Sequence, residues 1–214
     1  MVKPVTKREI YDLTVKYCDR ILEILKDWEG SNDHPPGRII YQCEWLKQEI
    51  EYNRLPVPFF DRINNIRHTY TDGDMPDEAY EKGIERYLQF IISLSKGYPV
   101  IEPRDYPEVQ GDIDRLLQRL RDGGWESKEG VPELLEDLAA IRERLETTEE
   151  VIPLPFAGHK FFDNPDWFGW YDPFFEGHPE LDEMLYEVAT EIFTGRFEKR
   201  HYTDPAPPQA TLEA

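Results

Sequence analysis

The sequence predicts an all-α fold: a single compact domain of six or seven helices with a long, aromatic-rich acidic loop before the last helix. Three observations support this prediction. Apolar residues recur every three or four positions over most of the 214 residues, which is the period of an amphipathic helix. Prolines and glycines stand at the ends of these periodic stretches, where helices begin and stop. No segment shows a convincing alternation of apolar and polar residues, the pattern of a strand.

The first two helices are expected over residues 6–28 and 38–54. Thr6 and Glu9 have the spacing of a capping box at the start of the first helix. Pro56 ends the second helix, because the residue before a proline disfavours helical backbone. The apolar stripes are Ile10, Leu13, Tyr17, Ile21, Leu25 and Trp28 in the first helix, and Ile39, Cys43, Leu46 and Ile50 in the second.

The middle of the chain contains three further helical patterns, over residues 76–95, 109–120 and 132–146. The helix over 76–95 has the broadest apolar face and is expected to be the most buried. Residues 59–70 are ambiguous, since their four apolar residues also suit a short helix. Residues 71–74, Thr-Asp-Gly-Asp, are a turn signal.

A segment of different character, residues 149–177, precedes the last helix. It is rich in proline and aromatic residues and lacks a helical period. Pro179 suits the first position of the last helix, and Gly195 suits its end. The helical domain is therefore expected to span residues 1–198, and residues 199–214 are expected to form a flexible tail.

Two cysteines, Cys18 and Cys43, lie on the apolar faces of the first two predicted helices. If these helices form a hairpin that turns at residues 30–37, Cys18 lies twelve residues before the turn and Cys43 six after it. At about 1.5 Å per residue their heights differ by roughly 9 Å, whereas a disulfide requires Cα atoms within about 7 Å. Two free, buried thiols are therefore expected.

The charge of the chain excludes two classes of partner. Against 44 Asp and Glu residues there are only 25 Lys and Arg residues, so the net charge is -19. Phosphate contacts to nucleic acid need a basic surface, and so does attraction to an anionic membrane. No apolar run approaches the roughly 20 residues that span a bilayer, and the first residues lack the apolar core of a signal peptide. We expect a soluble, cytoplasmic protein.

No known catalytic signature occurs in the sequence. There is no glycine-rich phosphate loop, no GxSxG serine, no HExxH pair and no Cys/His zinc spacing. His159 and His178 flank several acidic residues, and two histidines with carboxylates are a ligand set for a divalent metal, but their spacing is irregular. We therefore expect no cofactor, no metal site and no enzymatic activity.

Most of the excess acid lies in the second half of the chain. Residues 1–100 carry a net charge of -3, whereas residues 101–214 carry -16. Residues 149–177, named here the acidic aromatic segment, combine this charge with nine aromatic residues: Phe156, Phe161, Phe162, Trp167, Phe168, Trp170, Tyr171, Phe174 and Phe175.

The acidic aromatic segment has two interpretations. It is either a long loop that packs its rings on the helices and leaves its acids in water, or a docking surface. Aromatic residues are enriched at interface centres, and carboxylates around them attract a basic partner. Both interpretations hold if some rings face inward and others outward. The residues predicted to bind the partner are Asp163, Asp166, Trp167, Trp170, Tyr171, Asp172 and Glu176.

Three classes of function follow. The sequence favours an acidic binding protein that neutralises a basic protein partner, such as a bacterial immunity protein or antitoxin that blocks a toxin domain, for example a nuclease. The second class is a helical regulatory or scaffolding interaction domain, or a homodimer. The third and weakest is an enzyme with an unfamiliar site near His159 and His178.

Overall fold

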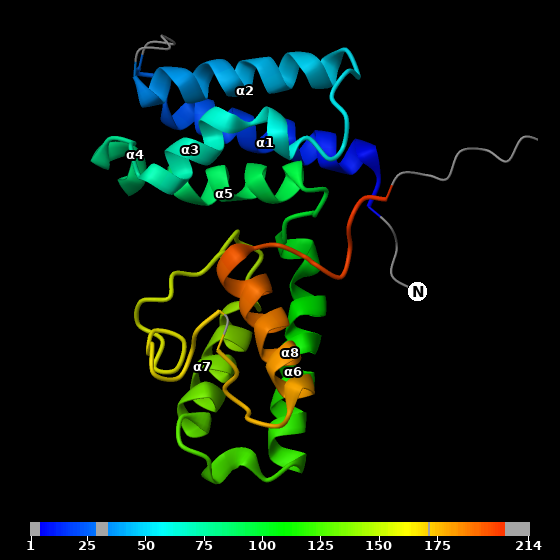
Figure 1. Ribbon diagram of the computed structural model, residues 1–214, viewed down its shortest axis with the longest axis vertical. Helices are drawn as coiled ribbons and strands as arrows, with labels where there is room; N and C mark the ends of the chain where they lie inside the picture. The colour runs from blue at the N-terminus through cyan, green and yellow to red at the C-terminus, as the bar shows by residue number, and fades with distance from the viewer. Residues whose placement is uncertain (1–4, 29–33, 171, 204–214) are drawn as a thin grey trace, which may run out of the picture. The chain divides into compact units, whose positions relative to one another are not determined.

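The computed structural model describes residues 5–28, 34–170 and 172–203, and over these residues the fold is all-α, as predicted (Figure 1). Eight α-helices and four shorter helical turns follow one another along this part of the chain. Extended pairing within it is limited to isolated β-bridges, such as those of Val5 with Tyr202 and of Gly169 with Asp172. No helix in the described ranges is long and apolar enough to cross a membrane.

Two compact units make up the chain. Unit 1 comprises residues 1–100 and 199–214, and unit 2 comprises residues 101–198. Each unit has its own cluster of buried apolar residues. The predicted domain over residues 1–198 thus contains two cores, and unit 2 is inserted into the chain of unit 1.

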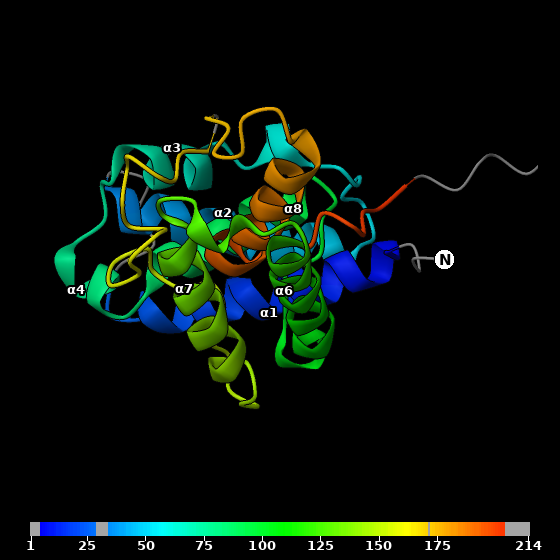
Figure 2. The same ribbon diagram turned by 90° about the horizontal axis from the view of Figure 1, so that it is seen from below.

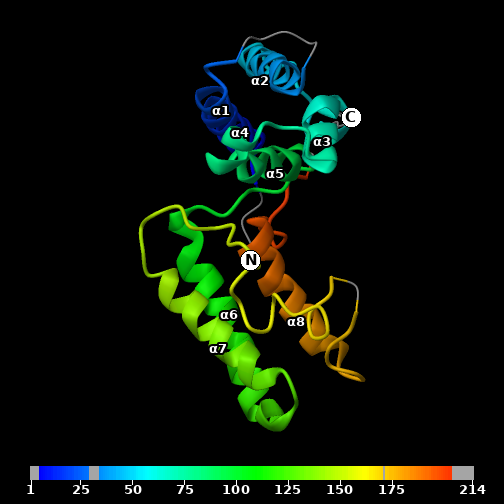
Figure 3. The same ribbon diagram turned by 90° about the vertical axis from the view of Figure 1, so that its left-hand side faces the viewer.

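Four of the five α-helices that the structure describes in unit 1 pack on one another around its core. The helix α1 packs on α2 and α5, and α3 packs on the same two helices (Figure 3). The hydroxyl of Thr6 caps α1 and accepts a hydrogen bond from the N–H of Glu9 at 3.1 Å, as the sequence spacing predicts. The elements are α1 (Lys7–Ile24), α2 (Pro35–Glu51), η1 (Phe60–Arg62), α3 (Asn64–Asp72), α4 (Asp77–Glu81) and α5 (Ile84–Ser95).

Three features of the helices in unit 1 differ from the prediction. The helix α1 ends at Ile24 and not at residue 28. The stretch 76–95 forms two helices rather than one, because Gly83 adopts a left-handed φ of 76° between α4 and α5. A left-handed residue interrupts the helical backbone, and glycine adopts this conformation without steric cost. In addition, α2 begins at Pro35 and not at residue 38, because His34 caps it by accepting a hydrogen bond from the N–H of Gly37 at 3.0 Å.

The two cysteines are free and buried, as predicted, but the predicted separation between them is wrong. Their thiols are hydrogen-bonded to each other, and this contact together with burial raises the pKa of Cys43. Because α1 ends at Ile24 and α2 begins at Pro35, Cys18 lies six residues before the end of α1 and Cys43 eight after the start of α2. The difference in height is then only about 3 Å.

Part of the predicted tail belongs to the structured part of unit 1. The N–H of Tyr202 donates a hydrogen bond to the carbonyl of Gly97 at 2.7 Å. Tyr202 also forms a parallel bridge with Val5 and packs against the core of the unit. Residues 204–214, which complete the predicted tail, lie outside the described residues.

Unit 2 is built on three helices, with α6 packed against both α7 and α8; Figure 2 shows α6 and α7 side by side. The acidic aromatic segment connects α7 to α8 without a regular helix, as predicted. The elements are η2 (Pro103–Asp105), α6 (Tyr106–Asp122), η3 (Trp125–Ser127), α7 (Val131–Arg144), α8 (Pro179–Ala189) and the π-helical turn η4 (Thr190–Thr194).

The start of the acidic aromatic segment is fixed by a tyrosine of α6. The buried Tyr106 hydroxyl donates a hydrogen bond to the carbonyl of Glu149 at 3.0 Å and accepts one from the N–H of Val151 at 2.8 Å. Further along, the N–H of Leu154 donates to the carbonyl of Ile192 in η4 at 2.9 Å. The segment is thereby held against the helices from its first residues.

Candidate functional site

A buried aspartate of α7 holds the middle of the acidic aromatic segment. The side chain of Asp137 accepts hydrogen bonds from the backbone N–H groups of Lys160 at 3.0 Å, Phe161 at 2.8 Å and Phe162 at 3.4 Å. Asp137 is only 6% exposed. A buried N–H group needs a partner, and here a carboxylate supplies it in place of a strand or helix.

A second buried aspartate, on α8, holds the end of the segment. Asp182 accepts hydrogen bonds from the N–H groups of Phe174 and Phe175, both at 2.9 Å. The hydroxyl of Tyr186, one turn further along α8, donates to the carbonyl of Asp172. Burial and the nearby carboxylates of Asp182 and Asp172 raise the pKa of Tyr186, so this donor stays protonated well into the alkaline range.

The rings of the segment face both inward and outward. Trp170 is 37% exposed and contacts the other rings only by its edge, with centroid distances of 5.3 Å to Phe168 and 5.9 Å to Phe156. Trp167 and Phe174 are half-buried. The buried rings, which belong to the core of unit 2, are Phe161, Phe162, Phe168 and Phe175.

A hollow of about 410 Å³, named here the acidic hollow, lies where the segment meets the turn before α7. Four exposed carboxylates and two half-buried rings line it, together with one lysine. Its charged and aromatic lining residues are Lys128, Glu129, Asp166, Trp167, Asp172, Phe174 and Glu176.

Gly130 allows the two rings of the hollow to pack closely. Its φ is 84°, in the left-handed region. A Cβ atom at this position would lie 3.1 Å from the Phe174 ring and 3.2 Å from the Trp167 ring. Both the backbone conformation and the space therefore require glycine at the start of α7.

One ring of the hollow, that of Phe174, already lies beside a positively charged side chain. The Nζ atom of Lys128 lies 4.5 Å from the centroid of the Phe174 ring. A cation at this distance is attracted by the negative face of the ring. The hollow thus combines an aromatic face that accepts a cation with carboxylates that attract further positive charge, and its chemistry is that of a site for Lys or Arg side chains.

The structure brings together four of the seven residues predicted to bind a partner. Asp166, Trp167, Asp172 and Glu176 line the acidic hollow. Asp163 does not, and its side chain accepts a hydrogen bond from the N–H of Gly158 at 3.2 Å within the loop. Trp170 does not line the hollow either. Tyr171 lies outside the described residues.

The sequence did not reveal the two aspartates that hold the segment, or that Lys128 and Glu129 line the hollow. Asp137 and Asp182 lie among the apolar residues of their helices, a position that indicates a buried, hydrogen-bonded carboxylate. Lys128 and Glu129 precede α7 in the chain, in a turn with no signal of its own, whereas the segment follows α7. Only the packing of α7 brings that turn to the rings.

The two histidines considered as metal ligands have different surroundings. His159 Nδ1 lies 3.9 Å from Asp137, beside the rings of Phe162 and Phe193. The ring of His178 packs edge-on against Trp125, at a centroid distance of 4.7 Å. Within the described residues, no three His, Cys, Asp or Glu side chains are arranged to hold a metal ion.

Comparison with protein-family models, with curated proteins and with solved structures finds no match for this chain, so its function is inferred from the geometry of the site.

Proposed function

We propose that the protein is an acidic binding protein that neutralises a basic protein partner, in the manner of a bacterial immunity protein or antitoxin that blocks a toxin domain such as a nuclease. The active site of a nuclease is basic because its substrate is anionic. An acidic surface that presents carboxylates in place of phosphates suits such a site by charge.

The acidic hollow is the observation that supports this proposal. An arginine side chain of the partner fits its chemistry, since guanidinium groups pair with carboxylates and stack on aromatic faces. The Phe174 ring already holds the Lys128 ammonium group, and an incoming guanidinium would compete for the same face. Trp170, the exposed ring of the neighbouring cluster, supplies an aromatic contact outside the hollow.

The charge of unit 2 supports encounter with a basic partner over a longer range. Residues 101–198 contain 25 Asp and Glu residues against nine Lys and Arg residues. A field of one sign steers an oppositely charged protein and raises its association rate, an effect that salt weakens. We place this interaction in the cytoplasm, where the buried thiols of Cys18 and Cys43 remain reduced.

Affinity purification from native cells tests the proposal. The tagged wild-type chain and the double variant Asp166→Lys/Glu176→Lys are compared as baits. The proposal predicts that only the wild-type chain retains a basic protein, and that the purified chain inhibits the activity of that protein. A basic protein that binds through the hollow without being inhibited would favour the regulatory or scaffolding domain. Equal recovery by both baits would exclude the hollow as the binding site.

A further inference from the structure

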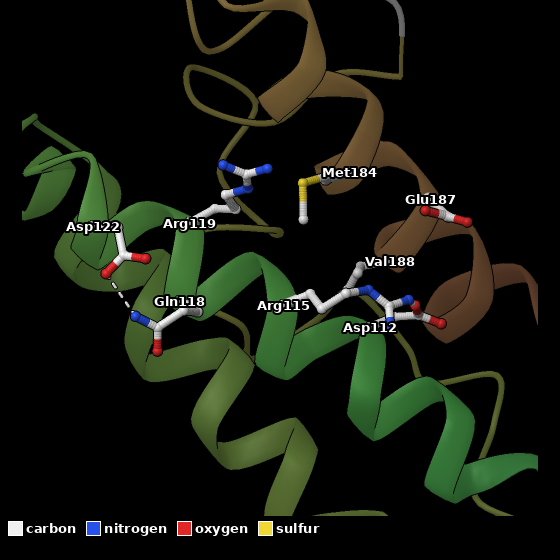
Figure 4. Close-up of a pocket in the computed structure, with 8 residues that line it drawn as sticks. All are labelled: Asp112, Arg115, Gln118, Arg119, Asp122, Met184, Glu187 and Val188. Atoms are coloured by element: carbon white, nitrogen blue, oxygen red, sulfur yellow. Dashed lines mark hydrogen bonds and ion pairs between the residues drawn. The ribbon is translucent and has the colours of Figure 1, made fainter.

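A groove of about 420 Å³ lies between α6 and α8 of unit 2, apart from the acidic hollow (Figure 4). Helix α6 contributes the polar side of the groove and α8 its apolar wall. The lining residues are Asp112, Arg115, Gln118, Arg119 and Asp122 from α6, and Met184, Glu187 and Val188 from α8.

Two of the acidic residues in the groove are paired within α6. The side chain of Asp112, which is 2% exposed, forms an ion pair with the guanidinium group of Arg115. Asp122 accepts a hydrogen bond from the side-chain amide of Gln118 at 2.6 Å. The charge of Asp112 is therefore balanced by Arg115, whereas Asp122 receives a hydrogen bond from a neutral amide and keeps its net charge.

Arg119 is different, because none of the described residues pairs with it. No carboxylate there lies within 4.0 Å of its guanidinium group, although unit 2 has a large excess of acids. Its charge reaches Glu180 only at longer range: the pKa of Glu180 is lowered first by a backbone hydrogen bond, then by His178, and least by Arg119.

The apolar wall faces this arginine. Figure 4 shows the guanidinium group of Arg119 and the thioether of Met184 directed toward one another across the groove. In this view Val188 lies below Met184, and Glu187 lies to the right of both on α8. Methionine adapts its shape to a bound hydrocarbon. A few polar groups beside an apolar wall, in a space of several hundred Å³, are typical of small-molecule sites.

We propose that this groove binds a small amphipathic monocarboxylate, with its carboxylate on Arg119 and its hydrocarbon chain along Met184, above the buried Val188. Arginine pairs with a carboxylate in a planar, two-point geometry. A phosphate monoester fits less well, because its second negative charge would be repelled by Asp122 and Glu187. This inference does not depend on the proposed function.

Methyl NMR of methionine tests the proposal with a direct reporter. The chain has three methionines, Met1, Met75 and Met184, and only Met184 lines the groove. The full-length protein, labelled with ¹³C at the methionine methyl groups, is titrated with octanoate, with octanol and with octylammonium. The variant Arg119→Gln removes the charge, and Arg121→Gln is the matched control on the same helix outside the groove.

We expect octanoate to shift the Met184 signal saturably while the Met75 signal, from unit 1, stays in place. Octanol and octylammonium should need at least tenfold higher concentrations. Arg119→Gln should weaken octanoate binding at least tenfold, and Arg121→Gln should change it by less than twofold. The proposal is overturned by the absence of a saturable Met184 shift, by equal binding of octanol or octylammonium, or by undiminished binding to Arg119→Gln.

Discussion

The carboxylate of Asp137, on α7, accepts a hydrogen bond from the backbone N–H of Phe161 at a distance of 2.8 Å. Phe161 is fully buried, so its N–H group has no access to water. With its bonds to the two neighbouring N–H groups, Asp137 does for this loop what a neighbouring strand does in a sheet. This explains how a segment without helix or strand keeps a defined shape and presents the acidic hollow.

Replacing this anchor should destabilise the protein. In Asp137→Ala three N–H groups lose their acceptor, and hydrogen bonds to a charged group contribute about 1.5–3 kcal/mol each. We expect the free energy of unfolding of unit 2 to fall by about 4.5 kcal/mol, the sum of three such bonds at their lower limit, measured by urea unfolding with tryptophan fluorescence. Asp163→Ala is the control, because Asp163 is exposed and accepts one bond at the surface. A similar loss in both variants would contradict the role given to Asp137.

Glycine should be required at position 130 for two reasons. Alanine there adopts an unfavourable left-handed conformation, and its Cβ atom also meets the Trp167 and Phe174 rings. Gly177 is a matched control, since its φ of 79° is similar but a Cβ atom at that position would meet nothing within 4 Å. We expect Gly177→Ala to cost about 1 kcal/mol and Gly130→Ala about 2–3 kcal/mol, measured from melting curves. Equal costs would show that the rings do not press on Gly130.

The acidic hollow predicts opposite effects for two charge changes. Once the basic partner is purified, Asp166→Lys should slow its association about tenfold at low salt, because the steering field is weakened. Lys128→Met should instead strengthen binding, since it removes the cation that competes for the Phe174 ring. Stopped-flow kinetics at two salt concentrations measures both, with Asp61→Lys in unit 1 as the control. Weaker binding by Lys128→Met would refute the proposed competition.

The buried thiol pair predicts a dependence of stability on pH. The hydrogen bond to Cys18 and burial raise the pKa of Cys43, so the folded state keeps its proton where the unfolded chain loses it. The contribution of the protonated Cys43 thiol to the free energy of unfolding is complete below the pKa of an unfolded cysteine, which is about 8.5. It decreases above this by about 1.4 kcal/mol per pH unit until the folded pKa is reached. Urea unfolding between pH 7.5 and 10 should therefore show a steeper loss for the wild-type chain than for Cys43→Ala. If the free energies of unfolding of the two proteins fell with pH in parallel, Cys43 would not be the group responsible.

Much of the fold follows from local sequence signals. The hydroxyl of Thr6 caps α1 as its spacing to Glu9 predicts, and α8 begins at Pro179, where proline fits the first turn. Local sequence does not predict that Gly83 divides a helix, because a glycine inside an apolar period is compatible with either outcome. Its left-handed conformation depends on the packing of α4 and α5, which local sequence does not encode.

The candidate site is only half predictable from the sequence. Asp166, Trp167, Asp172 and Glu176 are close in sequence, so their combination of charge and aromatic rings is visible along the chain. The cation that lies over the Phe174 ring is the ammonium group of Lys128. The helix α7 separates these two residues in the chain, and no local sequence pattern connects them. Asp137 looks like one acid among many until its three backbone donors are seen in space.

Site-specific photo-crosslinking from the acidic hollow tests whether a basic protein binds there. Pro173, an exposed residue of its rim, is replaced by benzoylphenylalanine, with the same change at the exposed Asp61 of unit 1 as the control. If a basic partner binds in the hollow, illumination of native cells should link position 173, but not position 61, to a basic protein. Adding Asp166→Lys and Glu176→Lys should abolish this adduct. No adduct from position 173, or an adduct that survives both charge reversals, would contradict the claim that this hollow docks a basic partner.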